Sequence, residues 1–255
     1  MTPLDTAHAA MEADPEDEAL RRQFYGLLAA SELFLVLEAE AENDTARPLL
    51  LGTEEGQVAL VFDTEERLAG FSDQPVPYLA LSGRRVVTML AGSGVSLGFN
   101  LVGAPSAIVL PPDVLDWIGE TIAGEVSADA LPEQIFAPRQ ASERFLVSLD
   151  ERLATLTGLA EKAYLVGAGA GTELMLGLTG VPDAAQDQVL RVLAEVRNFT
   201  APDQELSIGF IAAGSGAEAK LAATGLRFDI PVPGASPAPI RPAPGSDPEK
   251  PPRLR

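Results

Sequence analysis

Short apolar runs typical of β-strands alternate with helix-like segments through both halves of this 255-residue chain. This alternation constrains the fold more than any single motif does. Sheets and helices each bury an apolar face, so interleaved strands and helices pack as sheets covered by helices. The sequence therefore predicts an α+β (α/β-type) protein with two small mixed sheets covered by helices.

The expected elements follow from apolar periodicity and from residues that begin or end helices. Strands are expected at residues 33–38, 48–51, 57–63, 78–81, 95–100 and 107–110, and then at 133–138, 163–168, 173–178 and 206–212. Helices are expected at 15–29, 65–67, 84–90, 112–122, 143–156, 182–199 and 217–223. Four of these helices are expected to be capped by side-chain oxygens that accept hydrogen bonds from the first turn, from Asp14, Thr64, Ser82 and Ser142.

A polar stretch at 124–131 interrupts the apolar pattern and is the expected domain boundary. It separates a first domain at 15–123 from a second domain at 133–230. Residues 231–255 contain nine prolines and little apolar surface to bury, so a disordered tail is expected there.

The chain contains no cysteine and one histidine, His8, in a polar leader that precedes the first expected helix. Thiol nucleophiles, thiolate metal sites and nearly all imidazole chemistry are therefore excluded. No catalytic residue, metal site or cofactor is expected. A carboxylate pair drawn from Asp63, Asp150 and Glu173 remains an open alternative, because acid–base catalysis needs only two such groups in one cleft.

Acidic side chains dominate the composition: 37 of them against 18 basic ones give a formal net charge of −19. Such a charge repels nucleic-acid phosphates and anionic lipid head groups. The most apolar stretch, 95–110, is interrupted by polar residues, glycine and proline, and no basic and apolar secretory signal opens the sequence. We therefore expect a cytoplasmic protein that binds neither nucleic acid nor membrane.

Two glycine-rich segments are candidates for anion binding. Residues 167–171 follow a strand, but the alternating leucines after them indicate a second strand, so a hairpin turn is expected there. Gly214, Ser215 and Gly216 lie between a strand and a helix, where free backbone N–H groups can hold a small anion. A simple strand-to-helix turn is the alternative at this second segment.

Three further residues are candidate ligand contacts. Arg84 and Arg85 lie in the first turn of a helix, where guanidinium groups and the helix N-terminus can together pair with a carboxylate. Asn100 ends an apolar strand, the position at which ligands tend to lie in α/β folds. The alternatives are solvated arginines and an asparagine that caps a turn of its own chain.

Strand, turn and helix residues at 77–84, 94–100 and 110–117 form one characteristic set, and residues at 162–165, 173–178 and 187–199 form a second. In these passages the chain resembles the SseB family, the bacterial "enhanced serine sensitivity" proteins. The resemblance covers residues 15–230. It implies a cytoplasmic bacterial protein with an SseB N-terminal and an SseB C-terminal domain, and with no agreed reaction or cofactor.

Two functions are open on the sequence alone. The missing nucleophile, base and metal cluster, together with a family that has no assigned reaction, favour a non-enzymatic interaction or regulatory module with protein partners. The alternative is a small-molecule binding protein for an amino-acid-type metabolite. The serine-linked family name and the paired Arg84 and Arg85 favour this alternative.

Overall fold

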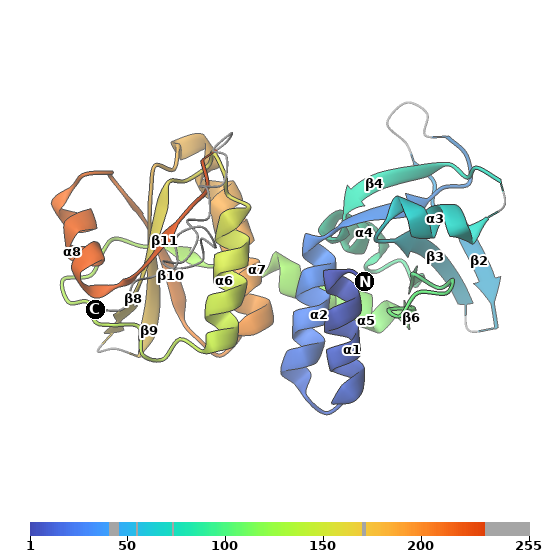
Figure 1. The fold of residues 1–255 in the computed structure, drawn as a ribbon, viewed down its shortest axis with the longest axis horizontal. Coiled ribbons are helices and arrows are strands. Elements are labelled where there is room, and N and C mark those ends of the chain that lie inside the picture. The colour runs from blue at the N-terminus through green and yellow to red at the C-terminus, as the bar shows by residue number, and fades with distance from the viewer. Residues whose placement is uncertain (41–45, 55, 73, 170–171, 233–255) are drawn as a thin grey trace, which may run out of the picture.

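The computed structural model describes residues 1–40, 46–54, 56–72, 74–169 and 172–232. Two mixed β-sheets, each covered by helices, make up the two halves of the molecule (Figure 1). The predicted α+β fold with two small mixed sheets is therefore confirmed. The predicted disordered tail falls outside the described residues from residue 233 onward.

The first sheet has the strand order β4-β1-β3-β5-β6, and β2 also pairs with β3. Its strands are β1 (Glu32–Val36), β2 (Leu50–Thr53), β3 (Gly56–Phe62), β4 (Tyr78–Ser82), β5 (Ser96–Phe99) and β6 (Ile108–Leu110). Strands β3 and β5 run parallel, and the other neighbouring pairs run antiparallel. The strands predicted for this half are thus present within a few residues of their expected ends.

Helices cover both faces of the first sheet unequally. The larger core contains side chains from α1 (Pro3–Ala13), α2 (Glu18–Ala30), α4 (Gly83–Leu90) and α5 (Pro112–Ala123). On the opposite face, α3 (Glu65–Phe71) packs Leu68 against a smaller apolar cluster. Thr64 and Ser82 cap α3 and α4 as predicted, each accepting a hydrogen bond from a first-turn N–H.

The second sheet has the order β11-β8-β9-β10-β7. Its strands are β7 (Ser127–Ala128), β8 (Lys162–Ala168), β9 (Glu173–Thr179), β10 (Leu206–Ile211) and β11 (Leu226–Asp229). β8 and β9 are antiparallel, as the predicted hairpin requires, although Ala170 and Gly171 at its tip lie outside the described residues. One face is covered by α6 (Glu143–Ala154) and α7 (Gln186–Thr200), which follows the short helix η2 (Asp183–Ala185); α8 (Gly216–Thr224) covers the other.

The predicted polar leader is wrong, because residues 3–13 form α1. Thr2 and Asp5 make a capping box at its start, and Leu4 and Met11 enter the core of the first half. His8 is buried with them, at 6% exposure. The cap of α2 is also displaced from its predicted position: Asp17, and not Asp14, accepts the first-turn hydrogen bonds.

Three predictions for the second half need correction. Residues 133–138 do not form a strand: Phe136 makes one isolated bridge to Gly167, and Pro138 lacks the N–H group that a ladder needs. The predicted boundary segment contributes β7, which pairs with β10. β11 was not expected, although Leu226 and Phe228 alternate with charged residues, because four residues at a sheet edge give only a short pattern. The division into domains at 15–123 and 133–230 stays a prediction.

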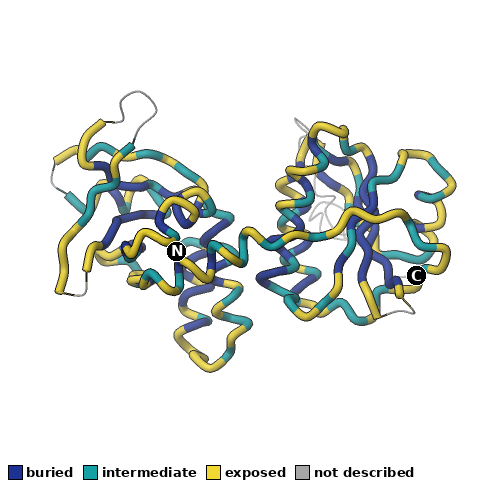
Figure 2. Tube along the Cα trace, turned by 180° about the vertical axis from the view of Figure 1, so that it is seen from behind, coloured by how far each residue is buried: buried dark blue, intermediate teal, exposed yellow. Residues whose placement is uncertain are grey.

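The two halves meet where α7 reaches the helices of the first half. Phe199, at the end of α7, belongs to the first core and lies edge-on to Trp117 of α5 at a centroid distance of 6.2 Å. Asn198 donates hydrogen bonds to the carbonyl oxygens of Thr121 (2.9 Å) and Gly124 (3.2 Å). Figure 2 shows buried segments along the strands and facing helices of both halves. Among the described residues, no helix combines the length and apolarity that a membrane span needs.

Candidate binding site between the two halves

A cavity of about 540 Å³ lies between α1 and α2 on one side and α6 and α7 on the other. We call it the interhelical cavity. Its apolar lining includes Leu27, Val196 and Phe199. Gly26 also lines it, and a Cβ there would lie 3.0 Å from the Phe199 side chain, so a larger residue would require α2 or Phe199 to shift slightly.

The cavity wall contains a buried charged group. Glu195 of α7 is only 2% exposed, and its carboxylate pairs with Arg84 of α4 in the first half and with Arg152 of α6 in the second. Arg152 and Glu195 line the cavity, and Arg152 Nη2 lies 3.6 Å from Glu195 Oε2. This distance is longer than a hydrogen bond. The three side chains therefore join both halves at the cavity.

Burial shifts the pKa values of both Glu195 and Arg152. It raises the pKa of the Glu195 carboxyl, and the two arginines oppose that rise. Burial also lowers the pKa of Arg152, against the attraction of Glu195. Within the described part of the chain, Arg84 contacts Oε1 closely, whereas Oε2 accepts no hydrogen bond, so acceptor capacity remains unused on that oxygen of a buried carboxylate.

The two arginines predicted as ligand contacts, Arg84 and Arg85, lie in different environments. Arg84 is engaged by Glu195 and is not among the residues that line the interhelical cavity. Arg85 is exposed on α4. Arg84 is therefore engaged by a carboxylate of the protein itself, and a ligand contact at Arg84 and Arg85 stays a prediction.

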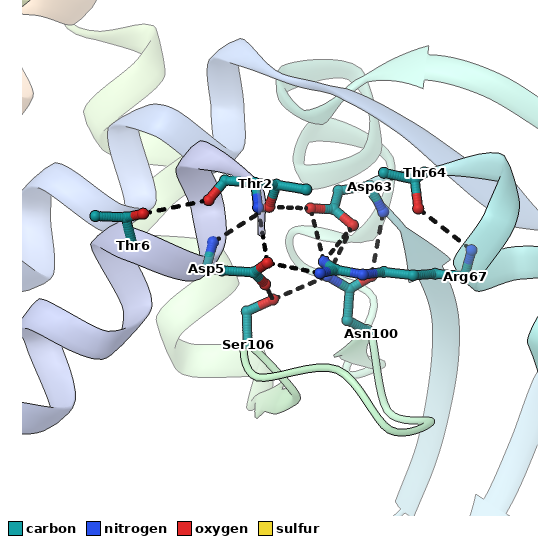
Figure 3. Close-up of polar contacts among 8 residues, drawn as sticks. All are labelled: Thr2, Asp5, Thr6, Asp63, Thr64, Arg67, Asn100 and Ser106. Atoms are coloured by element: carbon teal, nitrogen blue, oxygen red, sulfur yellow. Dashed lines mark hydrogen bonds and ion pairs between the residues drawn. The ribbon is translucent and has the colours of Figure 1, made fainter.

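Asn100 lies at the end of β5 and is fully buried. Its backbone has a φ of +51°, a left-handed conformation that asparagine tolerates better than most residues do. Its side-chain oxygen accepts a hydrogen bond from the Asp63 backbone N–H (3.1 Å), and its Nδ2 donates to Asp63 Oδ1 and Ser106 Oγ, both at 3.0 Å (Figure 3). These contacts favour the structural alternative for Asn100.

A second buried ion pair adjoins Asn100. Arg67 donates to both Asp63 oxygens and, at 2.6 Å, to Asp5 Oδ2 (Figure 3). Burial acts to raise the pKa of Asp5, but hydrogen bonds from Arg67, Ser106 and the Thr2 N–H outweigh it and hold the pKa well below its usual range. We call the set Thr2, Asp5, Asp63, Arg67, Asn100 and Ser106 the Asp5 cluster.

The predicted anion loop is filled by a side chain of the protein. Ser215 caps α8, and the Gly214 N–H donates to Glu218 Oε2 at 2.6 Å. Glu218 Oε1 also accepts hydrogen bonds from Lys162 (3.0 Å) and Tyr164 (2.8 Å). The Gly214 N–H first, and then these two side chains, lower the pKa of Glu218 to about 2. Gly216 follows in the first turn of α8.

The predicted site residues thus lie in three separate regions: on α4, at the end of β5 and at the start of α8. Sequence reasoning missed Arg152 and Glu195. Glu195 lies beside the apolar stripe of α7 that contains Val189, Leu193 and Val196, and it is buried because the first half packs on that side of the helix. Within the described residues, no three histidine, aspartate or glutamate side chains are grouped as a metal site.

Comparisons with known proteins identify one part of the chain. No match was found among curated proteins or among solved structures. A family model does match residues 4–117, which include α1 and nearly all of the first half up to the middle of α5. The matching model is described as SseB protein N-terminal domain, so the first half of the chain is similar to that family.

Proposed function

We propose that the protein is a non-enzymatic binding module that takes a small molecule into the interhelical cavity. The observation that carries this proposal is the Arg152–Glu195 pair in the cavity wall, in which Glu195 Oε2 accepts no hydrogen bond from the described residues. The volume of about 540 Å³ falls within the range of small-molecule sites, which are mostly apolar with a few fixed polar groups.

This proposal favours the second of the two functions expected from the sequence, with an amino-acid-type metabolite as its narrower form. An interaction module with protein partners stays a prediction, as do a cytoplasmic location, a bacterial source and an SseB C-terminal domain in the second half. The net charge of −19 supports the expectation that nucleic acid and anionic membranes are not partners.

A ligand screen by thermal shift and by intrinsic fluorescence tests the proposal. Trp117 is the single tryptophan of the chain and contacts Phe199, a cavity residue, so its emission should report occupancy. A ligand at about 100 times its Kd should stabilise the protein by about 2.7 kcal/mol and raise Tm by several degrees.

Matched variants locate the binding. Ala10→Phe fills the cavity from α1 and should abolish the response, whereas Ala219→Phe adds the same ring on exposed α8 and should leave it unchanged. The proposal is wrong if no compound in a broad library binds, or if the compounds that do bind respond equally to both variants.

A further inference from the structure

The Arg152–Glu195 pair lies in the wall of the interhelical cavity, where Arg152 is partly exposed and both Glu195 oxygens are buried. Arg152 Nη2 is 3.6 Å from Glu195 Oε2, and the described residues supply no hydrogen-bond donor to that oxygen. The Arg152 side chain retains 19% exposure and lines the cavity. A guanidinium group is suited to grip a carboxylate with two parallel N–H groups, and a carboxylate oxygen is suited to accept from an ammonium group.

A ligand with a single charge would meet one attraction and one repulsion here. A carboxylate placed on Arg152 without an ammonium group would lie beside the Glu195 carboxylate, and an ammonium placed on Glu195 alone would lie beside Arg152. A neutral ligand would leave both groups incompletely paired, which is costly in a buried site. A zwitterion laid antiparallel to the pair satisfies both.

The spacing of the pair limits the kind of zwitterion. An α-amino acid carries its ammonium and carboxylate groups on one carbon atom, so its two charges are about as close together as those of Arg152 and Glu195. Arg84 stays on the other oxygen, Oε1, and so keeps Glu195 paired when the ligand binds Oε2.

The helix C-termini at the cavity favour an ammonium group in the ligand. Three helices end at the cavity, where Ser31 follows α2, Thr155 follows α6 and Thr200 closes α7. A helix C-terminus carries partial negative charge, which attracts an ammonium group. The lining of Leu27, Val196 and Phe199 offers an apolar surface for the rest of the ligand.

We propose that the interhelical cavity binds an α-amino-acid zwitterion with an apolar side chain, its carboxylate on Arg152 and its ammonium group on Glu195. This inference rests on the proposed function, because it assigns a ligand class to the same cavity.

Four compounds that share one branched apolar body test the inference on the unmodified protein: leucine, isocaproic acid, isoamylamine and isocaproamide. They carry both charges, the carboxylate alone, the ammonium alone, and neither. Titration calorimetry and Trp117 emission should show leucine binding at least about tenfold more tightly than each of the other three.

Variants assign the two contacts. Arg152→Gln should bring the affinity for leucine down to about that for isoamylamine, and Glu195→Gln should bring it down to about that for isocaproic acid. Arg85→Gln makes the first of these changes on the exposed face of α4 and should leave leucine binding unchanged. Each variant is first checked for folding by its Tm. If Glu195→Gln fails to fold, the comparison of the four compounds on the unmodified protein still tests the inference.

The outcomes separate this inference from the proposed function. If isocaproic acid, isoamylamine or isocaproamide binds as tightly as leucine, or if leucine binding survives Arg152→Gln in a folded protein, the zwitterion assignment is overturned. If leucine does not bind while other library compounds occupy the cavity, the assignment fails and the proposed function stands. If no compound occupies the cavity, both fail.

Discussion

Ser106 Oγ donates a hydrogen bond to Asp5 Oδ1 at 2.6 Å, although 101 residues separate the two in the chain. Arg67 donates to the other oxygen of the same carboxylate. Thr2 adds a hydrogen bond from its hydroxyl to Asp63 Oδ2 at 2.7 Å. The Asp5 cluster therefore ties the start of α1 to β3, to α3 and to the loop after β5, and it makes α1 an integral part of the first half.

Asp5→Asn should destabilise the protein by about 2 kcal/mol, because it weakens the charge-assisted hydrogen bonds from Arg67 and Ser106, although Arg67 keeps its pair with Asp63. Glu12→Gln removes one charge from the exposed face of the same helix and should change stability by less than about 0.5 kcal/mol. Urea unfolding followed by circular dichroism measures both. Equal effects of the two substitutions would show that the Asp5–Arg67 pair does not anchor α1.

The depressed pKa of Asp5 also predicts how acid affects the protein. A carboxyl whose pKa is lower in the folded state than in the unfolded state contributes stability above its unfolded pKa, and that contribution is lost as pH falls toward the folded pKa. Unfolding free energies measured from pH 7 downward should therefore fall below about pH 4. Asp5→Asn should make this fall shallower, and a fall of unchanged steepness would argue against the depressed pKa.

Asn100→Ala should cost about 3 kcal/mol, because alanine loses the hydrogen bonds to Asp63 and Ser106 and is strained at a φ of +51°. Asn100→Gly loses the same hydrogen bonds without the strain, and should recover about 1 kcal/mol relative to alanine. Equilibrium unfolding of the two variants separates these contributions. Ligand binding in the interhelical cavity should persist in both variants if they are folded, since Asn100 does not line it.

Arg84→Ala should destabilise the protein by about 2 kcal/mol, because Glu195 is left buried with Arg152 as its remaining partner. Arg85→Ala is the matched control on the exposed face of α4 and should have an effect below about 0.5 kcal/mol. Since burial already raises the pKa of Glu195, the Arg84→Ala deficit should shrink as pH falls and the carboxyl takes up a proton. A deficit that grows on acidification would contradict this account.

The sequence predicted those elements whose signals are local. Thr64, Ser82 and Ser142 each precede an amphipathic segment and cap it as expected. By contrast, α1 was missed because only Leu4 and Met11 are large apolar residues among its alanines, and its anchor at Asp5 depends on distant Arg67 and Ser106.

The candidate site was less predictable than the fold for a related reason. Asn100 was predicted as a ligand contact at a strand end, yet its partners Asp63 and Ser106 come from other loops and occupy its amide. Arg152 and Glu195 lie on different helices of the second half, and the burial of Glu195 depends on the first half packing against α7. The spacing of residues within α6 or within α7 cannot predict a contact between the two helices or the packing of the first half on α7.

His8→Leu should leave stability unchanged or raise it by about 1 kcal/mol at neutral pH. His8 is 6% exposed and lies edge-on to Phe24 at 5.4 Å, and within the described residues its Nε2 has no hydrogen-bond partner. Leucine has a comparable size and removes that unpaired polar atom. His8→Ala is the control: it deletes buried volume between α1 and α2 and should cost about 2 kcal/mol. Denaturant unfolding measures the stability of both variants. If His8→Leu lowers the free energy of unfolding as much as His8→Ala does, the imidazole stabilises α1 through a polar contact and not through packing.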